Sequence, residues 1–183
     1  MIYIDRIHSF EDESKVIVGS ISLHHLQSLE DFFRLAVAEY PMHQFEDEEL
    51  HLLREDELRH WLHDAKASPD DLYLFCRQDE KVIALAELHF GKGKSRWHRA
   101  ECNITILKHP KKHEIRELLM GTLIQSAIAR DGVEELFIRI PEDDSRALAW
   151  CRRCKFKIQA VIPGAFIRED GTKATEYIMV RTL

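Results

Sequence analysis

The sequence predicts an α/β (α+β) fold in which a mixed, twisted sheet of six to seven strands is flanked by about four helices. Three observations support this prediction. Apolar, β-branched segments alternate with segments whose apolar residues recur at helical spacing. The stretch from 100 to 140 has the order strand, helix, strand, which favours a parallel pair joined by a right-handed crossover. The 183 residues contain no repeat or linker, so we expect a single domain over 1–183.

The first half of the chain is expected to contain one strand, two helices and a hairpin. The apolar, β-branched segment Val16 to Leu23 is typical of a strand. Ser28 suits the N-cap of a short helix that Pro41 ends. A second helix is expected from Glu49 to Ala67, where apolar residues form one stripe at helical spacing. Polar residues between two further apolar segments predict a hairpin with strands over 71–77 and 81–90.

The second half is expected to alternate between strands and helices. A strand over Ala100 to Leu107 leads into a long helix from about His113 to Arg130, which Asp131-Gly132 is expected to stop. The elements expected after it are a strand over 135–140, a helix over 143–154, and two strands over 156–167 and 174–180 that flank an Asp170-Gly171 turn.

The composition indicates a globular protein in a reducing compartment. Hydrophobic residues make up 45% and charged residues 32%, which is enough apolar material for a core. No signal peptide and no segment able to cross a bilayer is recognised, so we expect a cytoplasmic protein without a membrane partner. The cysteines form no spaced framework and are expected to be reduced thiols: Cys76, Cys102, Cys151 and Cys154.

The net charge of −6 is unevenly distributed. Residues 1–90 hold 8 basic and 20 acidic side chains, a net −12, whereas residues 91–183 hold 18 and 12, a net +6. The asymmetry is either accidental or lets an anionic ligand meet one half and a cationic ligand the other. The acidic total disfavours non-specific nucleic-acid binding. The histidines and cysteines lack the paired clusters that zinc commonly requires, so no metal is expected.

The region Arg99 to Val180 carries a resemblance to a known family. From Arg99 it reads RAECNITILKHPKKHEIRELLMGTLIQSAIARDGVEELFIRIPEDDSRALAWCRRCKF. Without a gap, it resembles the fourth strand, third helix, fifth strand and fourth helix of the GNAT superfamily of acyl-CoA N-acyltransferases, and Phe156 starts the sixth strand. The whole resemblance covers roughly 16 to 183. It implies a GNAT-like sheet in which acetyl-CoA, or another acyl-CoA, lies between splayed fourth and fifth strands.

The resemblance places the family's phosphate loop at the start of the long helix. A strand that feeds a helix through a tight loop presents free backbone N–H groups and a positive dipole end. The family pattern R/Q-x-x-G-x-G/A keeps only the first cation here, and charged residues replace the glycines. The alternative is a solvated basic loop without a ligand. The residues implied to bind the cofactor are Lys111, Lys112, His113, Glu114, Ile115 and Arg116 in this loop, Ile106 and Leu107 for the thioester carbonyl, and Asp144 where the family usually has Asn.

The resemblance also implies candidates for proton transfer. Transfer to an amine requires a base for the amine, and the departing thiolate benefits from an acid. In the family the base is often a Glu on the central strands, acting through water, and Glu101 and Glu87 are the candidates; the alternative is an edge or surface carboxylate. Cys151 occupies the position of the usual Tyr acid, and a thiol can donate a proton. The alternative is a small core residue, because Cys151 shares a helical face with other apolar residues.

The sequence therefore predicts an N-acyltransferase that moves an acetyl or other acyl group from acyl-CoA to a primary amine by direct transfer. The acidic run Glu46-Asp47-Glu48-Glu49 suits a cationic amine acceptor, small molecule or protein, although it also suits a solvated helix start. The alternative function is a catalytically inactive GNAT-like binding or assembly module. Residues 1–7 have strand character and are expected either to extend the sheet or to pair with a second copy in a homodimer.

Overall fold

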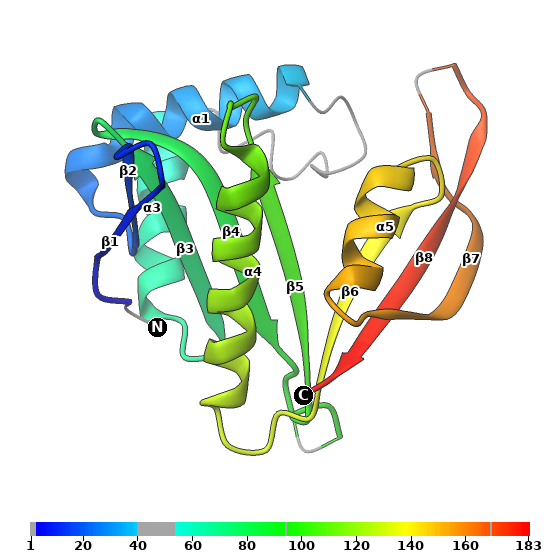
Figure 1. The fold of residues 1–183 in the computed structure, drawn as a ribbon. Coiled ribbons are helices and arrows are strands. Elements are labelled where there is room, and N and C mark those ends of the chain that lie inside the picture. The colour runs from blue at the N-terminus through cyan, green and yellow to red at the C-terminus, as the bar shows by residue number, and fades with distance from the viewer. Residues whose placement is uncertain (1–2, 40–53, 94, 169) are drawn as a thin grey trace.

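The computed structural model describes residues 3–39, 54–93, 95–168 and 170–183, and its centre is a sheet (Figure 1). Within these residues the sheet has eight strands in the order β1-β2-β3-β4-β5-β6-β8-β7. The strands are β1 (Arg6–Ser9), β2 (Lys15–Gly19), β3 (Asp71–Gln78), β4 (Lys81–Phe90), β5 (Arg99–Ile106), β6 (Glu135–Pro141), β7 (Lys157–Ile167) and β8 (Lys173–Thr182). The described α-helices are α1 (Leu26–Glu39), α3 (Glu55–Ala67), α4 (Lys112–Ile128) and α5 (Ser145–Arg153). The predicted fold class is confirmed, but the sheet has one strand more than expected.

The additional strand is β1, which pairs antiparallel with β2. Its four residues expose most of their side chains, so the sequence lacks the buried alternation that identifies a strand. β1 does extend the sheet, which was one of the two outcomes expected for the N-terminal segment.

Two local expectations near the first helix are wrong. The strand predicted from Val16 to Leu23 already ends at Gly19, and a short 3-10 helix, η1, spans Leu23–His25. Ser28 lies inside α1 instead of capping it. Its hydroxyl accepts a hydrogen bond of 2.7 Å from the N–H of Val82, so a tertiary contact to β4 uses the side chain that the sequence assigned to a cap. The second predicted helix is described only from Glu55, and its residues 49–53 lie outside the described part.

The helices cover the two faces of the sheet in separate groups (Figure 1). One core cluster joins strand residues such as Leu88 and Cys102 to α4 and α5. The other joins Leu85 and Phe75 to α1 and α3. Because successive strand residues point to opposite faces, neighbouring positions on one strand belong to different clusters. The same alternation places Glu87, His89, Glu101 and Asn103 on the α3 side.

The strand–helix–strand unit at the centre of the sheet forms as predicted. α4 connects β5 to β6, and this is the parallel strand pair in the described sheet. The two strands pair only at three positions, the last of which joins Glu101 to Phe137. β5 continues to Ile106 and β6 continues to Pro141, but beyond Glu101 and Phe137 the two strands do not pair with each other in the described structure. The two strands therefore diverge and leave a gap beside the start of α4, as Figure 1 shows.

Candidate functional site

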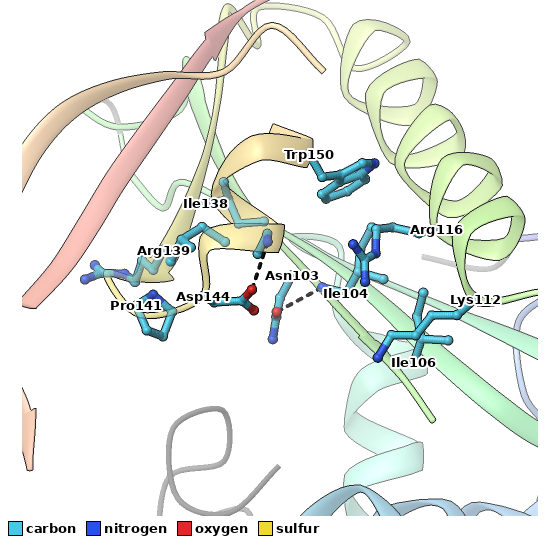
Figure 2. Close-up of a pocket in the computed structure, with 12 residues that line it drawn as sticks. Asn103, Ile104, Ile106, Lys112, Arg116, Ile138, Arg139, Pro141, Asp144 and Trp150 are labelled. Carbon is cyan, nitrogen blue, oxygen red and sulfur yellow. Dashed lines mark hydrogen bonds between the residues drawn. The ribbon is translucent and has the colours of Figure 1, made fainter. Parts of the chain in front are cut away.

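The gap between β5 and β6 contains a narrow cavity of about 90 Å³. Figure 2 shows its walls: side chains from β5 and β6 on two sides, from α4 on the third and from the start of α5 on the fourth. The lining residues are Asn103, Ile104, Ile106, Lys112, Arg116, Ile138, Arg139, Ile140, Pro141, Asp144, Ala147 and Trp150. Four residues of the predicted cofactor site, Ile106, Lys112, Arg116 and Asp144, therefore meet around one cavity.

The backbone of β5 presents alternate residues to this gap. The N–H of Leu107 donates to the carbonyl of Ile83 at 3.0 Å, so this amide belongs to the ladder with β4. In an antiparallel ladder the residues in between turn their amides the other way. The amides of Ile104 and Ile106 thus lie on the edge that faces away from β4. The Ile104 N–H donates to the Asn103 Oδ1 at 2.9 Å. Because its amide points to β4, Leu107 does not suit its predicted contact with a thioester carbonyl. The amide of Ile106 lies on the edge that faces the gap and does suit this contact.

The predicted phosphate loop divides into residues that line the cavity and residues that do not. Lys112 and Arg116 are one helical turn apart on α4 and share its cavity side. The Arg116 guanidinium lies 5.1 Å from the ring of Trp150, a cation–π distance. Ile115 is fully buried in the core beneath them. The spacing of four residues between the two cations is the signal in the sequence that selects them.

The remaining loop residues point elsewhere. The Lys111 Nζ pairs with Asp12 at 2.8 Å, and this contact raises the pKa of Lys111. His113 and Glu114 are exposed and do not line the cavity. The acidic side chain of Glu114 lies 3.9 Å from the Lys111 Nζ and so does not close the gap.

The start of α5 forms the far wall of the cavity. The Asp144 Oδ1 accepts a hydrogen bond of 2.8 Å from the N–H of Ala147, so Asp144 is the N-cap of α5. Trp150, almost fully buried, donates from its Nε1 to the Glu117 Oε1 at 2.8 Å and links α5 to α4. Both contacts hold α5 beside the gap, and neither Trp150 nor Glu117 was selected from the sequence.

Cys151 lies in the core, one helical turn after Ala147 on the same face of α5. Its side chain is fully buried, and burial raises the pKa of its thiol to about 12. It does not line the cavity. Burial without access to the gap argues against Cys151 as the acid for a leaving thiolate and favours its alternative role as a small core residue.

Glu87 and Glu101, the two predicted bases, lie on neighbouring strands on the α3 side of the sheet. Glu87 accepts a hydrogen bond of 3.2 Å from the Nδ2 of Asn103, and Asn103 lines the cavity. Burial raises the pKa of Glu87 above its ordinary value. Glu101 instead accepts from the Arg139 Nε at 2.9 Å. Asn103 and Arg139, which sequence reasoning missed, therefore connect the two carboxylates to the edge of the gap.

Other groups of possible chemical importance are few in the described structure. Each of the four cysteines is a free thiol. Among the described residues, no cluster of three or more His, Cys, Asp or Glu side chains could hold a metal ion. No helix in the described ranges is long and apolar enough to span a bilayer. The acidic run at 46–49 lies outside the described residues.

Several solved structures share the fold of this chain. The chain is similar to a GNAT-family acetyltransferase from Streptococcus pneumoniae, with a TM-score of 0.80, 17% identity, and coverage of 92% of this chain and 99% of the other. It is also similar to ribosomal-protein-alanine N-acetyltransferase from Brucella melitensis, with a TM-score of 0.74, 16% identity, and coverage of 91% and 99%. A third similar structure is yncA from Salmonella typhimurium with its cofactor acetyl-CoA, with a TM-score of 0.73, 11% identity, and coverage of 92% and 94%.

At this identity the structural likeness supports the fold, whereas the family assignment comes from the sequence. No curated protein matches the chain. The model of the Acetyltransferase (GNAT) family matches residues 29–156, well over half of the chain. This match confirms the family inferred from the sequence, together with its enzyme class and its acyl-CoA cosubstrate: the chain belongs to the GNAT family of acetyltransferases.

Proposed function

We propose that this chain transfers an acetyl or other acyl group from acyl-CoA directly to a primary amine, with the cosubstrate between β5 and β6. The observation that carries the proposal is the separation of these strands beyond Glu101, next to two cations at the start of α4. The acyl-CoA supplies a thioester carbon that an amine can attack. The chain's own residues bind this cosubstrate, orient it and remove a proton from the amine.

Lys112 and Arg116 are the proposed partners of the CoA diphosphate. They project into the cavity from the first turns of α4, where the positive end of the helix dipole also favours an anion. The cavity is narrow, so we propose that the flexible Arg116 side chain turns from Trp150 towards the phosphates as the cosubstrate enters. A cation–π contact is worth about 0.5–2 kcal/mol, so charged hydrogen bonds to the phosphates can offset its loss.

The outward amides of β5 are the proposed donors to the thioester carbonyl. Ile104 and Ile106 lie on the edge that faces the gap, and the Ile104 N–H now bonds to the Asn103 Oδ1. We propose that the carbonyl oxygen of the acyl group replaces this amide oxygen. A fixed backbone donor in a site without water stabilises the negative charge that develops on such an oxygen.

Glu87 is the proposed base, and the amine acceptor approaches from the α3 side of the sheet. Asn103 connects Glu87 to the gap, and the carboxylate is buried where desolvation makes it a stronger proton acceptor. Glu101 is more exposed than Glu87 and is occupied by an ion pair with Arg139, so we do not propose it as the base. The acidic run Glu46-Asp47-Glu48-Glu49 remains the proposed attraction for a cationic acceptor.

The proposal is tested by two measurements on the purified chain. Release of free CoA thiol from acetyl-CoA is followed against a panel of primary amines, and acetyl-CoA binding is followed by calorimetry. Lys112→Ala and Arg116→Ala are each expected to weaken acetyl-CoA binding about tenfold, the order expected for a lost charged hydrogen bond. Lys111→Ala is the matched control, since this neighbouring lysine pairs with Asp12, and its affinity should stay close to wild type.

Two outcomes would contradict the proposal. Acetyl-CoA binding that is equally sensitive to Lys111→Ala would move the phosphate site away from the cavity. Tight acetyl-CoA binding without thiol release for any amine would favour the non-catalytic binding module.

A further inference from the structure

A chain of polar side chains runs from the gap across the sheet, and the proposed function uses only its first two members. Asn103 on β5 donates to the Glu87 Oε2 on β4 at 3.2 Å. The Glu87 Oε1 lies 3.9 Å from the His89 Nε2, two residues further along β4. The His89 Nδ1 lies 2.8 Å from the Asp71 Oδ1 on β3. Asp71 also accepts a hydrogen bond of 2.6 Å from the Ser68 hydroxyl.

The register of the strands fixes this chain. Asp71 is opposite His89, Tyr73 is opposite Glu87, and Asn103 is opposite Glu87 on the other side. The Tyr73 ring packs edge-on against the His89 ring, with centroids 5.6 Å apart. The imidazole is therefore held both by a hydrogen bond at its Nδ1 and by an aromatic contact, and its Nε2 faces Glu87.

These contacts determine where a proton can reside. Asp71 is acceptor-only when ionised, so the His89 Nδ1 carries a proton and donates it to Asp71. Burial acts to raise the pKa of Asp71, but the hydrogen bonds with Ser68 and His89 outweigh it, and the pKa lies below its ordinary value. The neutral imidazole then has its lone pair on Nε2, facing the Glu87 carboxyl. The Nε2 can therefore accept a proton from the Glu87 carboxyl once the separation of 3.9 Å is bridged.

We propose that His89, oriented by Asp71, is the relay that takes the amine proton from Glu87 to solvent. This inference rests on the proposed function, in which Glu87 is the base. His89 is a positioning and relay residue, because it acts on the amine only through Glu87. The separation of 3.9 Å between Nε2 and Oε1 requires a small side-chain movement or one bridging water at the moment of transfer.

The proton balance of the reaction requires such an exit. A primary ammonium loses two protons when it becomes an amide, as the C–N bond forms and the C–S bond of the thioester breaks. One of these protons ends on the CoA thiol and the other must leave for solvent. In the relay, Glu87 accepts that proton and passes it to the His89 Nε2. The imidazolium, stabilised by the Asp71 carboxylate, then releases it to water.

The outer end of the chain opens on a groove, which provides the exit. A cavity of about 860 Å³ lies on the same side of the sheet and is lined by both Asp71 and His89, together with Lys92, Arg96, Glu101 and Arg139. The His89 side chain is 38% exposed, whereas that of Glu87 is 13% exposed. The order of exposure thus runs from the buried base to the partly exposed imidazole and then to the open groove.

The charged and titratable groups around Glu87 come from each strand that packs against it. They are Asp71 and Tyr73 on β3, His89 on β4, Glu101 on β5 and Arg139 on β6, with Lys92 in the loop after β4. Asp71 acts to raise the pKa of Glu87, and His89 acts to lower it. Removing Asp71 is therefore expected to lower the pKa of Glu87, whereas removing His89 is expected to raise it.

The experiment compares His89→Ala with wild type at saturating acetyl-CoA and amine, with thiol release as the readout. We expect kcat to fall about ten- to a hundredfold, at or below the lower end of what acid–base groups contribute, while acetyl-CoA affinity is unchanged. Added imidazole should restore part of kcat in His89→Ala, because the groove admits it beside Glu87. His63→Ala is the matched control, since His63 also pairs with an aspartate, at 3.3 Å, but is 80% exposed on α3. It should keep wild-type kcat and show no imidazole effect.

A second variant covers the case in which His89→Ala does not fold. Burial is the main cause of the raised pKa of Glu87, and Asp71→Asn keeps the size of the side chain but removes one of the negative charges that raise this pKa further. The acid limb of the kcat–pH profile should then move to lower pH, a shift that loss of structure alone does not produce. An unchanged limb in Asp71→Asn would overturn the relay, and so would an imidazole-insensitive, wild-type kcat in His89→Ala; either result leaves the proposed function intact. If the wild-type chain acylates no amine, or Glu87→Gln keeps full activity, the proposed function or its base fails and the relay falls with it.

Discussion

Glu87 and Glu101 are carboxylates on adjacent strands and on one face of the sheet, but their surroundings differ in every respect that controls proton transfer. Glu87 is mostly buried, and its nearest partners are the amide of Asn103 and the imidazole of His89. Glu101 is 34% exposed and pairs with Arg139, which also contacts Glu176 at 3.1 Å. Burial raises the affinity of Glu87 for a proton, whereas the Glu101 carboxylate is engaged by the guanidinium of Arg139. Position on the sheet therefore does not identify the base; burial, together with the connection to the gap through Asn103, does.

The largest effect expected from this comparison is the loss of turnover in Glu87→Gln. The amide keeps the shape and can still bond to Asn103, but it cannot accept a proton from an amine. We expect kcat to fall about 10²- to 10³-fold, the range of general-base catalysis. Steady-state thiol release measures kcat, and calorimetry should show unchanged acetyl-CoA affinity. Turnover within a few-fold of wild type would show that another group is the base.

The same substitution is expected to alter stability in a pH-dependent way. Burial raises the pKa of Glu87 in the folded chain, so folding favours the protonated form. Its contribution to stability is fully present below the unfolded pKa and is lost as pH rises through the folded pKa. Glu87→Gln does not titrate, so its stability relative to wild type should increase from acidic to neutral pH. Urea unfolding at several pH values measures this difference, and a constant difference would contradict the burial argument.

Glu101→Gln is the matched substitution on the neighbouring strand and should have a smaller effect. It removes one partner of a half-exposed ion pair, which is worth about 0–1 kcal/mol. We expect kcat to change by less than about tenfold, because Arg139 retains Glu176 as a partner. Steady-state kcat, measured for Glu101→Gln and Glu87→Gln under the same conditions, tests the comparison. A larger loss of kcat in Glu101→Gln than in Glu87→Gln would reverse the assignment of the base.

The fold could be predicted from the sequence because its signals are local. The helix predicted over 143–154 and the parallel unit around α4 follow from apolar periodicity and from the order of elements. The sequence left open whether the N-terminal segment joins the sheet, because the side chains of β1 are mostly exposed. Ser28 was misassigned because a distant backbone amide, that of Val82, uses its hydroxyl.

The candidate site could be predicted only in part, because it depends on contacts between strands. The sequence selected Lys112, Arg116 and Glu87, but it gave equal weight to Lys111, which pairs with Asp12. Period-two alternation indicates that Glu87 and His89 share a face. The register that brings Asn103 to one side of Glu87 and Asp71 close to His89 has no local signal. Asn103, Arg139 and Asp71 could therefore not be found before the strands were aligned.

The smallest effect is expected on the far side of the gap, at Cys151. If proton transfer is confined to the Glu87 side, Cys151→Ala should leave the kcat–pH profile unchanged, because the thiol is buried and its pKa is raised to about 12. The cost should appear in stability instead, about 1–2 kcal/mol for the volume lost from the core. Urea unfolding and the pH profile are measured together, with the less buried Cys154→Ala as the control that should cost less. Loss of the alkaline limb in Cys151→Ala alone would restore the thiol as the acid and would place proton transfer on both sides of the gap.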